Sequence, residues 1–279
     1  MISGKGAESD ISLSAKLTSE GGCMKLVVRR ITGDDDFSAI EKLQKDIWGI
    51  DDITTVPAHI LQAVCKYDAG FLAGAFYENS IIGFLFALNT RDRQVQYTHM
   101  IGVNPEWQSG RKGINVGTTL NEFHKSEALK QGIMFIEWTF DPLHSNNANL
   151  NFHKLGVKVV RYEPDAYGKS SEVGIYRGMP TDRVLVRWPL KSYLPTNVDI
   201  CDIEKISLVS TPDEINGYSF RMEVPFDIQV LKKESIESAC AFRLQSREVF
   251  IEALKMGYNV KDFICLKNES RNCYIFSRE

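Results

Sequence analysis

The stretch from residue 95 to residue 140 constrains the fold of this chain most. It contains a strand pattern, VQYTHMIGV, a loop with two glycines, NPEWQSGRKGIN, a helical pattern and a second apolar strand, IMFIEWTF. In the helical part Val116, Leu120 and Phe123 recur at helical spacing, and Gly132 is placed to end the helix. This succession predicts an α/β fold in which a loop delivers a helix N-terminus beside a strand.

The flanking patterns extend this unit in both directions. Helices are predicted over 34–49, where Phe37, Ile40, Leu43 and Ile47 share a face, and over 56–68 and 145–156. Strands are predicted over 24–31, 70–78, 80–89, 157–164 and 182–190, with a hairpin turn at Glu78-Asn79.

A second group of elements follows a polar joint near residues 192–199. We predict strands around 203–208 and 218–224, a long helix that ends before Gly257, and a closing hairpin of 259–266 with 272–278. The helix is expected to bury one apolar face, formed by Ile236, Cys240, Leu244, Ile251 and Leu254. The predicted division is therefore a flexible leader over 1–23, a first domain over 24–192 and an extension over 193–279 that packs on it.

Composition and charge exclude several classes. The 279 residues are 43% hydrophobic and 25% charged, which fits a folded globular protein. Lys and Arg number 33 against 36 Asp and Glu, and the net charge of −3 gives no reason to expect a nucleic-acid or membrane partner. Residues 1–22 lack the apolar centre of a signal peptide. The six cysteines occur singly, so we expect reduced thiols, no metal site and a cytoplasmic protein.

The glycine-containing loop at 104–115 is the first candidate for chemistry. The first N–H groups of a helix have no intrahelical acceptor, and the helix dipole favours negative charge there, so such a loop suits a phosphate group. Glycine lets a ligand approach the backbone closely. Many strand–helix turns contain glycine for structural reasons alone, so a purely structural role of these glycines stays open.

Two strings resemble the GNAT superfamily of N-acetyltransferases. VQYTHMIGVNPEWQSGRKGINVGTTLNEF is similar to its strand, pyrophosphate loop and helix, and IEWTFDPLHSNNANLNFHKLGVKVVRY to the strand and helix that follow. The strings WTFDP and FHKLG, with Tyr162 and Tyr167-Gly168, resemble an uncharacterised bacterial branch that carries a C-terminal extension. The resemblance covers residues from Met24 to the end. It implies an α+β fold with a mixed, mostly antiparallel twisted sheet, helices on both faces, and acetyl-CoA or another acyl-CoA as co-substrate.

The best match to the family's loop pattern is Lys112-Gly113-Ile114-Asn115-Val116-Gly117. It departs from the pattern in two places, because Lys112 stands at the first position and Asn115 replaces the middle glycine. Asn tolerates a left-handed backbone better than other non-glycine residues, so we expect the loop to keep its shape. The cofactor-binding residues that the resemblance implies are Ile101, Val103, Arg111, Lys112, Gly113, Asn115, Gly117, Thr118, Asn147 and Phe152.

The position of the family's usual general acid, a tyrosine, is occupied by Phe152, which cannot donate a proton. Other candidates for proton transfer or substrate binding are His99, Asp141, His153 and Tyr162, with Tyr167 as a further option. The residue pattern by itself favours His99 as a hydrogen-bonded histidine in a half-buried strand, and the role of a base stays open. Asp141 could hold a substrate ammonium or only start the turn that follows its strand.

Several other polar and aromatic residues are expected to be structural. We predict that Asn146 or Asn147 caps the helix that follows and that Trp107 and Trp138 are core or loop anchors. His124 and Lys125 are expected on a solvated helix face.

Together these observations favour an acyl-CoA-dependent N-acyltransferase whose acceptor is an amine of a small molecule or peptide. Two alternatives stay open: a non-catalytic acyl-CoA-binding or sensor protein, and a CoA-thioester enzyme other than an N-acyltransferase. A homodimer is left open as the assembly.

Overall fold

The computed structural model describes residues 13–19, 22–49, 55–110, 112–168, 178–191, 198–266 and 271–278. The chain forms two compact units, here called the first unit, Met1–Met134, and the second unit, Phe135–Glu279. The second unit combines the end of the predicted first domain with the predicted extension. The division near residue 193 stays a prediction.

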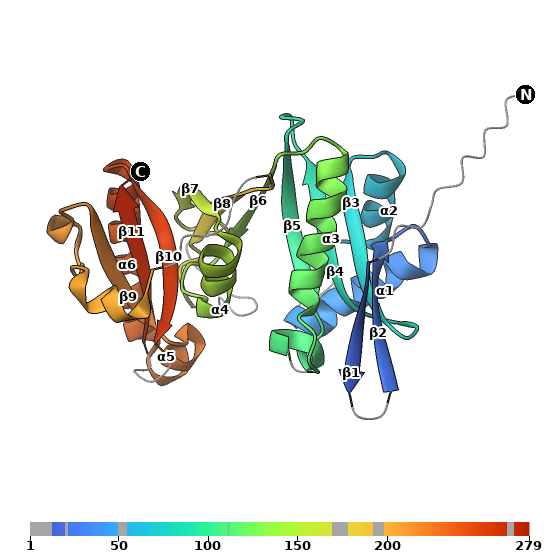
Figure 1. Ribbon diagram of the computed structural model, residues 1–279, viewed down its shortest axis with the longest axis horizontal. Helices are drawn as coiled ribbons and strands as arrows, with labels where there is room; N and C mark the ends of the chain where they lie inside the picture. The colour runs from blue at the N-terminus through green and yellow to red at the C-terminus, as the bar shows by residue number, and fades with distance from the viewer. Residues whose placement is uncertain are drawn as a thin grey trace, which may run out of the picture. The chain divides into compact units, whose positions relative to one another are not determined.

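The first unit is built on one antiparallel sheet in the order β1-β2-β3-β4-β5 (Figure 1). A two-residue turn at Glu78-Asn79 joins β3 to β4, as predicted, with Glu78 at a φ of 54°. The strands are β1 (Leu13–Ser19), β2 (Gly22–Arg30), β3 (Gly70–Tyr77), β4 (Ser80–Asn89) and β5 (Val95–Val103).

One expectation for this sheet is wrong. Leu13–Ser19, placed in a flexible leader by the sequence, forms β1 and pairs with β2 along its length, from Leu13 opposite Val28 to Ser19 opposite Gly22. Residues 1–12 of the predicted leader lie outside the described residues.

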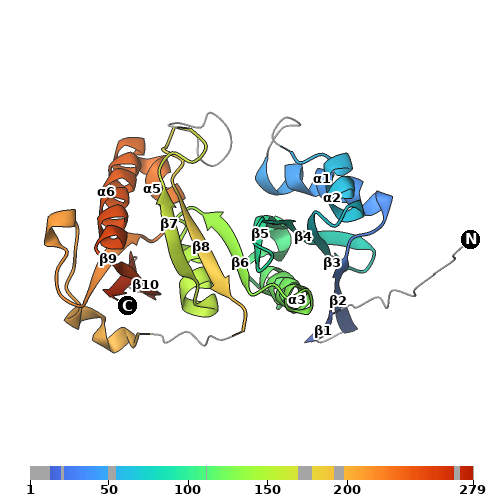
Figure 2. The ribbon, with the colours of Figure 1, turned by 90° about the horizontal axis from the view of Figure 1, so that it is seen from above.

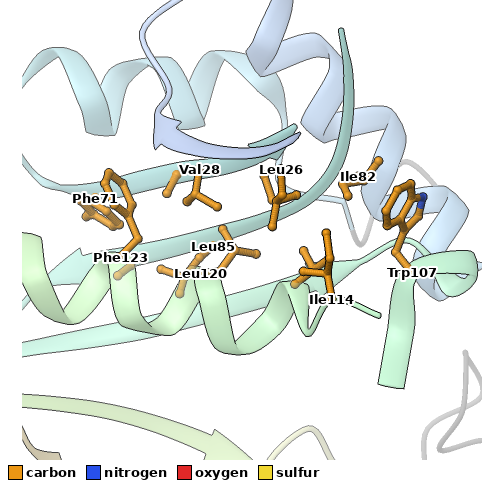
Figure 3. Packing of buried hydrophobic residues seen from close by; sticks show 13 residues of the cluster. Leu26, Val28, Phe71, Ile82, Leu85, Trp107, Ile114, Leu120 and Phe123 are labelled. Atoms are coloured by element: carbon orange, nitrogen blue, oxygen red, sulfur yellow. The ribbon is translucent and has the colours of Figure 1, made fainter. Parts of the chain in front are cut away.

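Helices cover both faces of this sheet (Figure 2). The helix α3 (Val116–Lys130) packs its Leu120 and Phe123 on one face, against β2, β3 and β4 (Figure 3). On the other face lie α1 (Asp34–Trp48) and α2 (Ala58–Lys66), with Ile40 and Leu61 fully buried. The predicted apolar faces of α1 and α3 are therefore confirmed, because both follow the 3.6-residue period.

The second unit holds two antiparallel sheets, in the orders β6-β8-β7 and β10-β11-β9. The strands are β6 (Phe135–Phe140), β7 (Lys158–Glu163), β8 (Arg183–Pro189), β9 (Ser219–Pro225), β10 (Tyr258–Leu266) and β11 (Arg271–Arg278). The helical elements are α4 (Ser145–Ala148), the π-helical turn η2 (Asn149–Leu155), α5 (Ile228–Glu234) and α6 (Ile236–Lys255).

In the second unit, aromatic packing joins the elements around β6, β7 and β8 to the C-terminal elements around β9, β10 and β11. Phe250 of α6 lies 5.4 Å from Tyr162 of β7 and 5.0 Å from Tyr274 of β11, measured between ring centroids. The Phe152 ring of η2 lies 5.7 Å from the Tyr274 ring. Because these rings are buried, α6 and β11 share a core with η2 and β7.

The predicted apolar face of α6 is wrong. Its buried residues are Ala239, Arg243, Ser246, Val249, Phe250 and Ala253. The predicted face is instead partly in solvent, since Leu244 is 45% and Ile251 40% exposed. The physical reason is that Arg243 finds a buried carboxylate, which makes burial of a charged residue tolerable.

Most of the other predicted strands and helices are present, with one exception among the strands. The predicted strand around 203–208 is wrong, because Ile200–Lys205 forms a 3-10 helix, η4, and only Leu208 bridges to Arg221. The mostly antiparallel sheet with helices on both faces and the smaller C-terminal α+β part match the predicted fold class. No helix among the described residues is long and apolar enough to cross a membrane.

Candidate functional site

Buried hydrophobic side chains anchor the loop between β5 and α3 to the core of the first unit. Trp107, in the 3-10 helix η1 (Pro105–Gly110), is 6% exposed, and Ile114 and Val116 are also buried in the core cluster under α3 (Figure 3). Trp107 therefore serves as a loop anchor, as predicted. Gly113 has a φ of 75°, a conformation that favours glycine. The buried anchors fix the polar part of the loop at the N-terminus of α3.

The charge of Lys112 is held close to this loop. Its ammonium lies 4.3 Å from the centroid of the Trp107 ring and 3.6 Å from a carboxylate oxygen of Glu106, and the side chain is 43% exposed. Both contacts are at the surface and are weak. An anion arriving at the helix N-terminus could therefore recruit Lys112 at small cost. Arg111, its predicted neighbour in this role, lies outside the described residues.

Asn115 shapes the start of α3 through its side chain. Its Oδ1 accepts a hydrogen bond from the Thr118 N–H at 3.2 Å, which caps the helix. The backbone φ of Asn115 is −93°, so the expectation that this residue matters for a left-handed backbone is wrong.

Gly117 lies in the first turn of α3, where the structure has room for a Cβ atom. A Cβ added there would come no closer than 3.9 Å to the Asn115 Oδ1 and the Val103 Cγ2, and no positive φ requires a glycine at this position. Neither packing nor backbone geometry explains the glycine. Space beside first-turn N–H groups fits the close approach of a phosphate group. The predicted cofactor residues Gly113, Asn115, Gly117 and Thr118 lie together around the N-terminus of α3.

The strand β5 is irregular at His99. The pairing of β5 with β4 shifts register between Phe86 and Ala87, so that Met100 and Thr98 are paired while His99 between them is not. A bulge of this kind re-aims the side chains beside it. The His99 ring meets the Phe86 ring edge-on at 5.9 Å, and burial lowers the pKa of His99 below its ordinary value. The residues that follow on this strand, Ile101 and Val103, are only partly covered.

In the second unit, Phe152 is enclosed by aromatic rings. It is 1% exposed and lies 5.9 Å from Phe140 and 5.7 Å from Tyr274. Asn147 is exposed in α4. The helix begins at Ser145, with His144 at the capping position, so the prediction that Asn146 or Asn147 caps it is wrong.

Asp141 has an internal partner that the sequence did not indicate. Its carboxylate, 2% exposed, receives two hydrogen bonds from the Arg243 guanidinium, at 2.5 and 2.7 Å. Burial alone would raise the pKa of Asp141, but the charge and hydrogen bonds of Arg243 outweigh it and hold that pKa below the ordinary value. Both oxygens are thus occupied, and a structural role replaces the expected contact with a substrate ammonium.

Tyr162 belongs to a second buried network. Its hydroxyl donates to the Asp182 carboxylate at 2.7 Å, and Arg247 of α6 donates to both Asp182 and Asp165. Burial, followed by the nearby Asp182 charge, raises the pKa of Tyr162 well above its usual range. The hydroxyl is therefore engaged with a carboxylate that is itself fully buried.

His153 differs from Asp141 and Tyr162 because its side chain is 37% exposed. Its Nδ1 lies 3.0 Å from the Oδ1 of Asp262, a fully buried residue of β10. Sequence reasoning missed Asp262, Arg243 and Arg247 as partners. No local signal marked these partners, because other charged and polar residues stand beside them in the same strand and helix patterns. Among the described residues no group of three or more His, Cys, Asp or Glu could hold a metal ion.

No family model matches this sequence, and no curated protein matches it. Several solved structures of N-acetyltransferases share a similar arrangement. The ribosomal-protein-S18-alanine N-acetyltransferase from Escherichia coli aligns over 62% of this chain and 99% of its own, with 13% identity and a TM-score of 0.47. An IAA acetyltransferase from Bacillus cereus aligns over 59% and 99%, with 20% identity and a TM-score of 0.45.

An aminoglycoside 6'-N-acetyltransferase complexed with coenzyme A aligns over 60% of this chain and 98% of its own, with 13% identity and a TM-score of 0.45. The TM-scores of all three lie below 0.5, so the likeness says nothing about the roles of residues in this chain.

Proposed function

We propose that this chain is an acyl-CoA-dependent N-acyltransferase that moves an acetyl or longer acyl group to an amine of a small molecule or peptide. The observation that carries the proposal is Gly117 in the first turn of α3, where a Cβ would fit but none is present beside the first-turn N–H groups. Such a helix N-terminus binds phosphate through unpaired N–H donors and its dipole, and coenzyme A carries a pyrophosphate. The resemblance of the sequence to the GNAT superfamily supports the same ligand.

The proposed cofactor residues in the first unit are Ile101, Val103, Lys112, Gly113, Asn115, Gly117 and Thr118, with Arg111. Asn147 and Phe152 of the second unit are proposed on the resemblance alone. His99 is proposed to receive a proton from the substrate ammonium, since its lowered pKa keeps the imidazole neutral near pH 7. We place the protein in the cytoplasm, as a monomer or a homodimer.

Graded substitutions at Gly117 test the cofactor site. Gly117→Ala and Gly117→Val fill the space beside the helix N-terminus without a close contact to Val103 or Asn115 at the Cβ. We expect acetyl-CoA to bind at least tenfold more weakly in the valine variant, about 1.4 kcal/mol, and less so in the alanine variant. Isothermal titration calorimetry gives the dissociation constant, and circular dichroism checks that each variant is folded.

Removal of a lysine charge tests the site in a second way, with a lysine outside the loop as the matched control. Lys112→Ala should weaken acetyl-CoA binding about fivefold to tenfold, because a charge-assisted bond to phosphate is lost. Lys66→Ala removes an exposed lysine of α2 and should leave binding unchanged. Equal affinity of wild type, Gly117→Val and Lys112→Ala would contradict the proposed site.

One observation favours a second candidate, a protein that binds acyl-CoA without the usual chemistry. Phe152 stands at the position of the family's general acid and is packed between Phe140 and Tyr274, so a hydroxyl there would meet apolar rings. Incubation with acetyl-CoA and a panel of amines separates the candidates. Binding without release of free thiol supports the sensor, and release that needs no amine supports a thioester enzyme of another kind.

A further inference from the structure

The second unit contains a pocket of about 200 Å³ between α6, β9 and residues 207–210, a segment here called the strap. An engineered apolar cavity of about 150 Å³ already holds one benzene ring. The apolar part of the lining is formed by Val209 of the strap, Met222 of β9 and Phe242 of α6. Val209 and Met222 are only 1% and 3% exposed, so the pocket offers a dry wall to one small apolar group.

The strap pairs with β9 as a parallel strand at one residue. The Arg221 N–H donates to the Ser207 C=O at 2.8 Å, and the Arg221 C=O accepts from the Val209 N–H at 2.8 Å. The N–H and C=O groups of successive strand residues point to opposite edges of the strand. Glu223, two residues after Arg221 in β9, therefore turns its N–H and C=O toward the same edge as Arg221, away from β11.

The strap turns away from β9 at Ser210. The Ser210 N–H donates to the Glu214 carboxylate at 2.6 Å, and the Ser210 C=O accepts from the Gln245 amide of α6 at 2.8 Å. Within the part of the chain that the structure describes, the strap thus pairs with β9 at Arg221 alone. The Glu223 N–H and C=O are left without a strand partner on this edge, and Glu223 lines the pocket.

A backbone donor and acceptor beside an apolar pocket match the chemistry of an extended peptide. A peptide residue can accept from the Glu223 N–H with the C=O before it and donate to the Glu223 C=O with the N–H after it, as the strap does at Arg221. The next peptide residue then points its side chain to the other face of the sheet, toward Met222. The space left by the departing strap is where that side chain fits.

We propose that this pocket binds an extended peptide segment, which continues the parallel pairing of the strap along β9 and places a small apolar side chain against Val209, Met222 and Phe242. Two backbone hydrogen bonds to Glu223 hold the peptide and set its direction. Specificity comes from the one residue whose side chain enters the pocket. The site lies wholly within the second unit, and its existence does not depend on the proposed acyl transfer.

The blocked dipeptide acetyl-Ala-Val-amide is the probe, added to the full chain labelled with ¹³C at the methionine methyl groups. We expect the Met222 methyl signal to shift and to saturate with a Kd of about 1 mM, the affinity of a ligand this small. Acetyl-Ala-Gly-amide has no side chain for the pocket and should leave the signal in place. An ester analogue, with oxygen instead of the valine N–H, should bind about fivefold to tenfold more weakly, because it cannot donate to the Glu223 C=O.

Glu223→Pro and Glu223→Ala form a matched pair of variants. Both remove the Glu223 carboxylate and its ion pair with Arg271, but only proline removes the N–H that faces the pocket. An edge strand tolerates proline where the N–H does not serve the ladder. We expect the dipeptide to bind about fivefold to tenfold more weakly to the proline variant than to the alanine variant.

Ser210→Leu places a larger side chain in the pocket and should abolish binding of the dipeptide. Ser207→Leu changes an exposed residue of the same strap outside the lining, and should keep the wild-type Kd. Three results would overturn the inference: no shift of the Met222 signal in wild type at about 10 mM dipeptide, equal affinity for the dipeptide and its ester, or unchanged binding to Ser210→Leu. The first two need no variant, so they decide the matter even where a substitution prevents folding.

Discussion

The two units bury polar side chains in different ways. In the first unit the deeply buried polar groups include neutral pairs, such as His124, whose Nε2 lies 2.6 Å from the Gln96 Oε1. In the second unit they include full charges, with Asp141 paired to Arg243 across 102 residues of sequence. A buried charge is costly unless its partner is in place, so the second unit depends on contacts between distant segments. The first unit depends more on apolar packing.

Loss of the Asp141–Arg243 ion pair should lower the free energy of unfolding more than the other changes predicted below. Removal of one partner from a buried ion pair costs about 3–5 kcal/mol, so Asp141→Ala and Arg243→Ala should each destabilise the second unit by that amount. Hydrogen exchange of peptides from each unit, measured by mass spectrometry, gives the unit-resolved effect.

The double variant Asp141→Leu/Arg243→Met is the control, since replacement of both charges by apolar groups of similar size is often tolerated. Equal loss of protection in the two units after Asp141→Ala would break the distinction between them.

As the pH falls, the protonation of His124 in the unfolded chain should lower the stability of the first unit. Burial, and next the charge of Arg30, lower the pKa of His124 to about 3, while the unfolded chain has an ordinary value near 6.5. Below pH 6.5 the unfolded state therefore binds a proton that the folded state does not. The stability contributed by the neutral imidazole is complete above pH 6.5 and falls by about 1.4 kcal/mol per pH unit toward pH 3.

Urea unfolding between pH 7 and pH 4.5 measures this slope. His124→Gln keeps a hydrogen-bond donor for Gln96 but has no ring that titrates. This variant should therefore reduce the slope of the unfolding free energy against pH. His99 and His144 also have lowered pKa values, so a smaller slope of the same sign should remain. Asp141, whose pKa is depressed, should add its own loss only below about pH 4, where the unfolded carboxyl takes up a proton. An unchanged slope in His124→Gln would refute the assignment.

The smallest effect is expected at Glu127, the ion-paired carboxylate on α3. It accepts from Arg30 at 2.8 Å and from Lys130 at 2.6 Å, but these cations are 44% and 50% exposed. Water screens such pairs, so Glu127→Gln should cost less than about 1 kcal/mol. Thermal unfolding in low and high salt checks this, because the difference from wild type should shrink as salt rises. A cost similar to that of Asp141→Ala would erase the contrast between the two units.

The sequence predicted elements better than it predicted side-chain environments. The apolar faces of α1 and α3 were predicted correctly because periodic hydrophobicity is a local signal. The same reasoning failed for α6, where Arg243 and Ser246 occupy the buried face while Leu244 lies in solvent. It failed again for His124, expected on a solvated face and found 1% exposed against Phe71. In both cases a polar residue is buried because a distant segment supplies its partner.

The candidate site divides in the same way. The loop at 104–115 and the helix N-terminus after it were predictable, since glycine positions and helical periodicity are written in consecutive residues. The partners of Asp141, Tyr162 and His153 were not, because Arg243, Asp182 and Asp262 carry no local mark of what they contact.

By itself the sequence determined the succession of strands and helices and the place of the glycine loop, because backbone preferences and hydrophobic periods act over a few residues. The tertiary structure alone decided which polar side chains are buried and which carboxylate His153 contacts. The reason is that a charge can leave water only when a partner meets it, and here that partner lies 109 residues away.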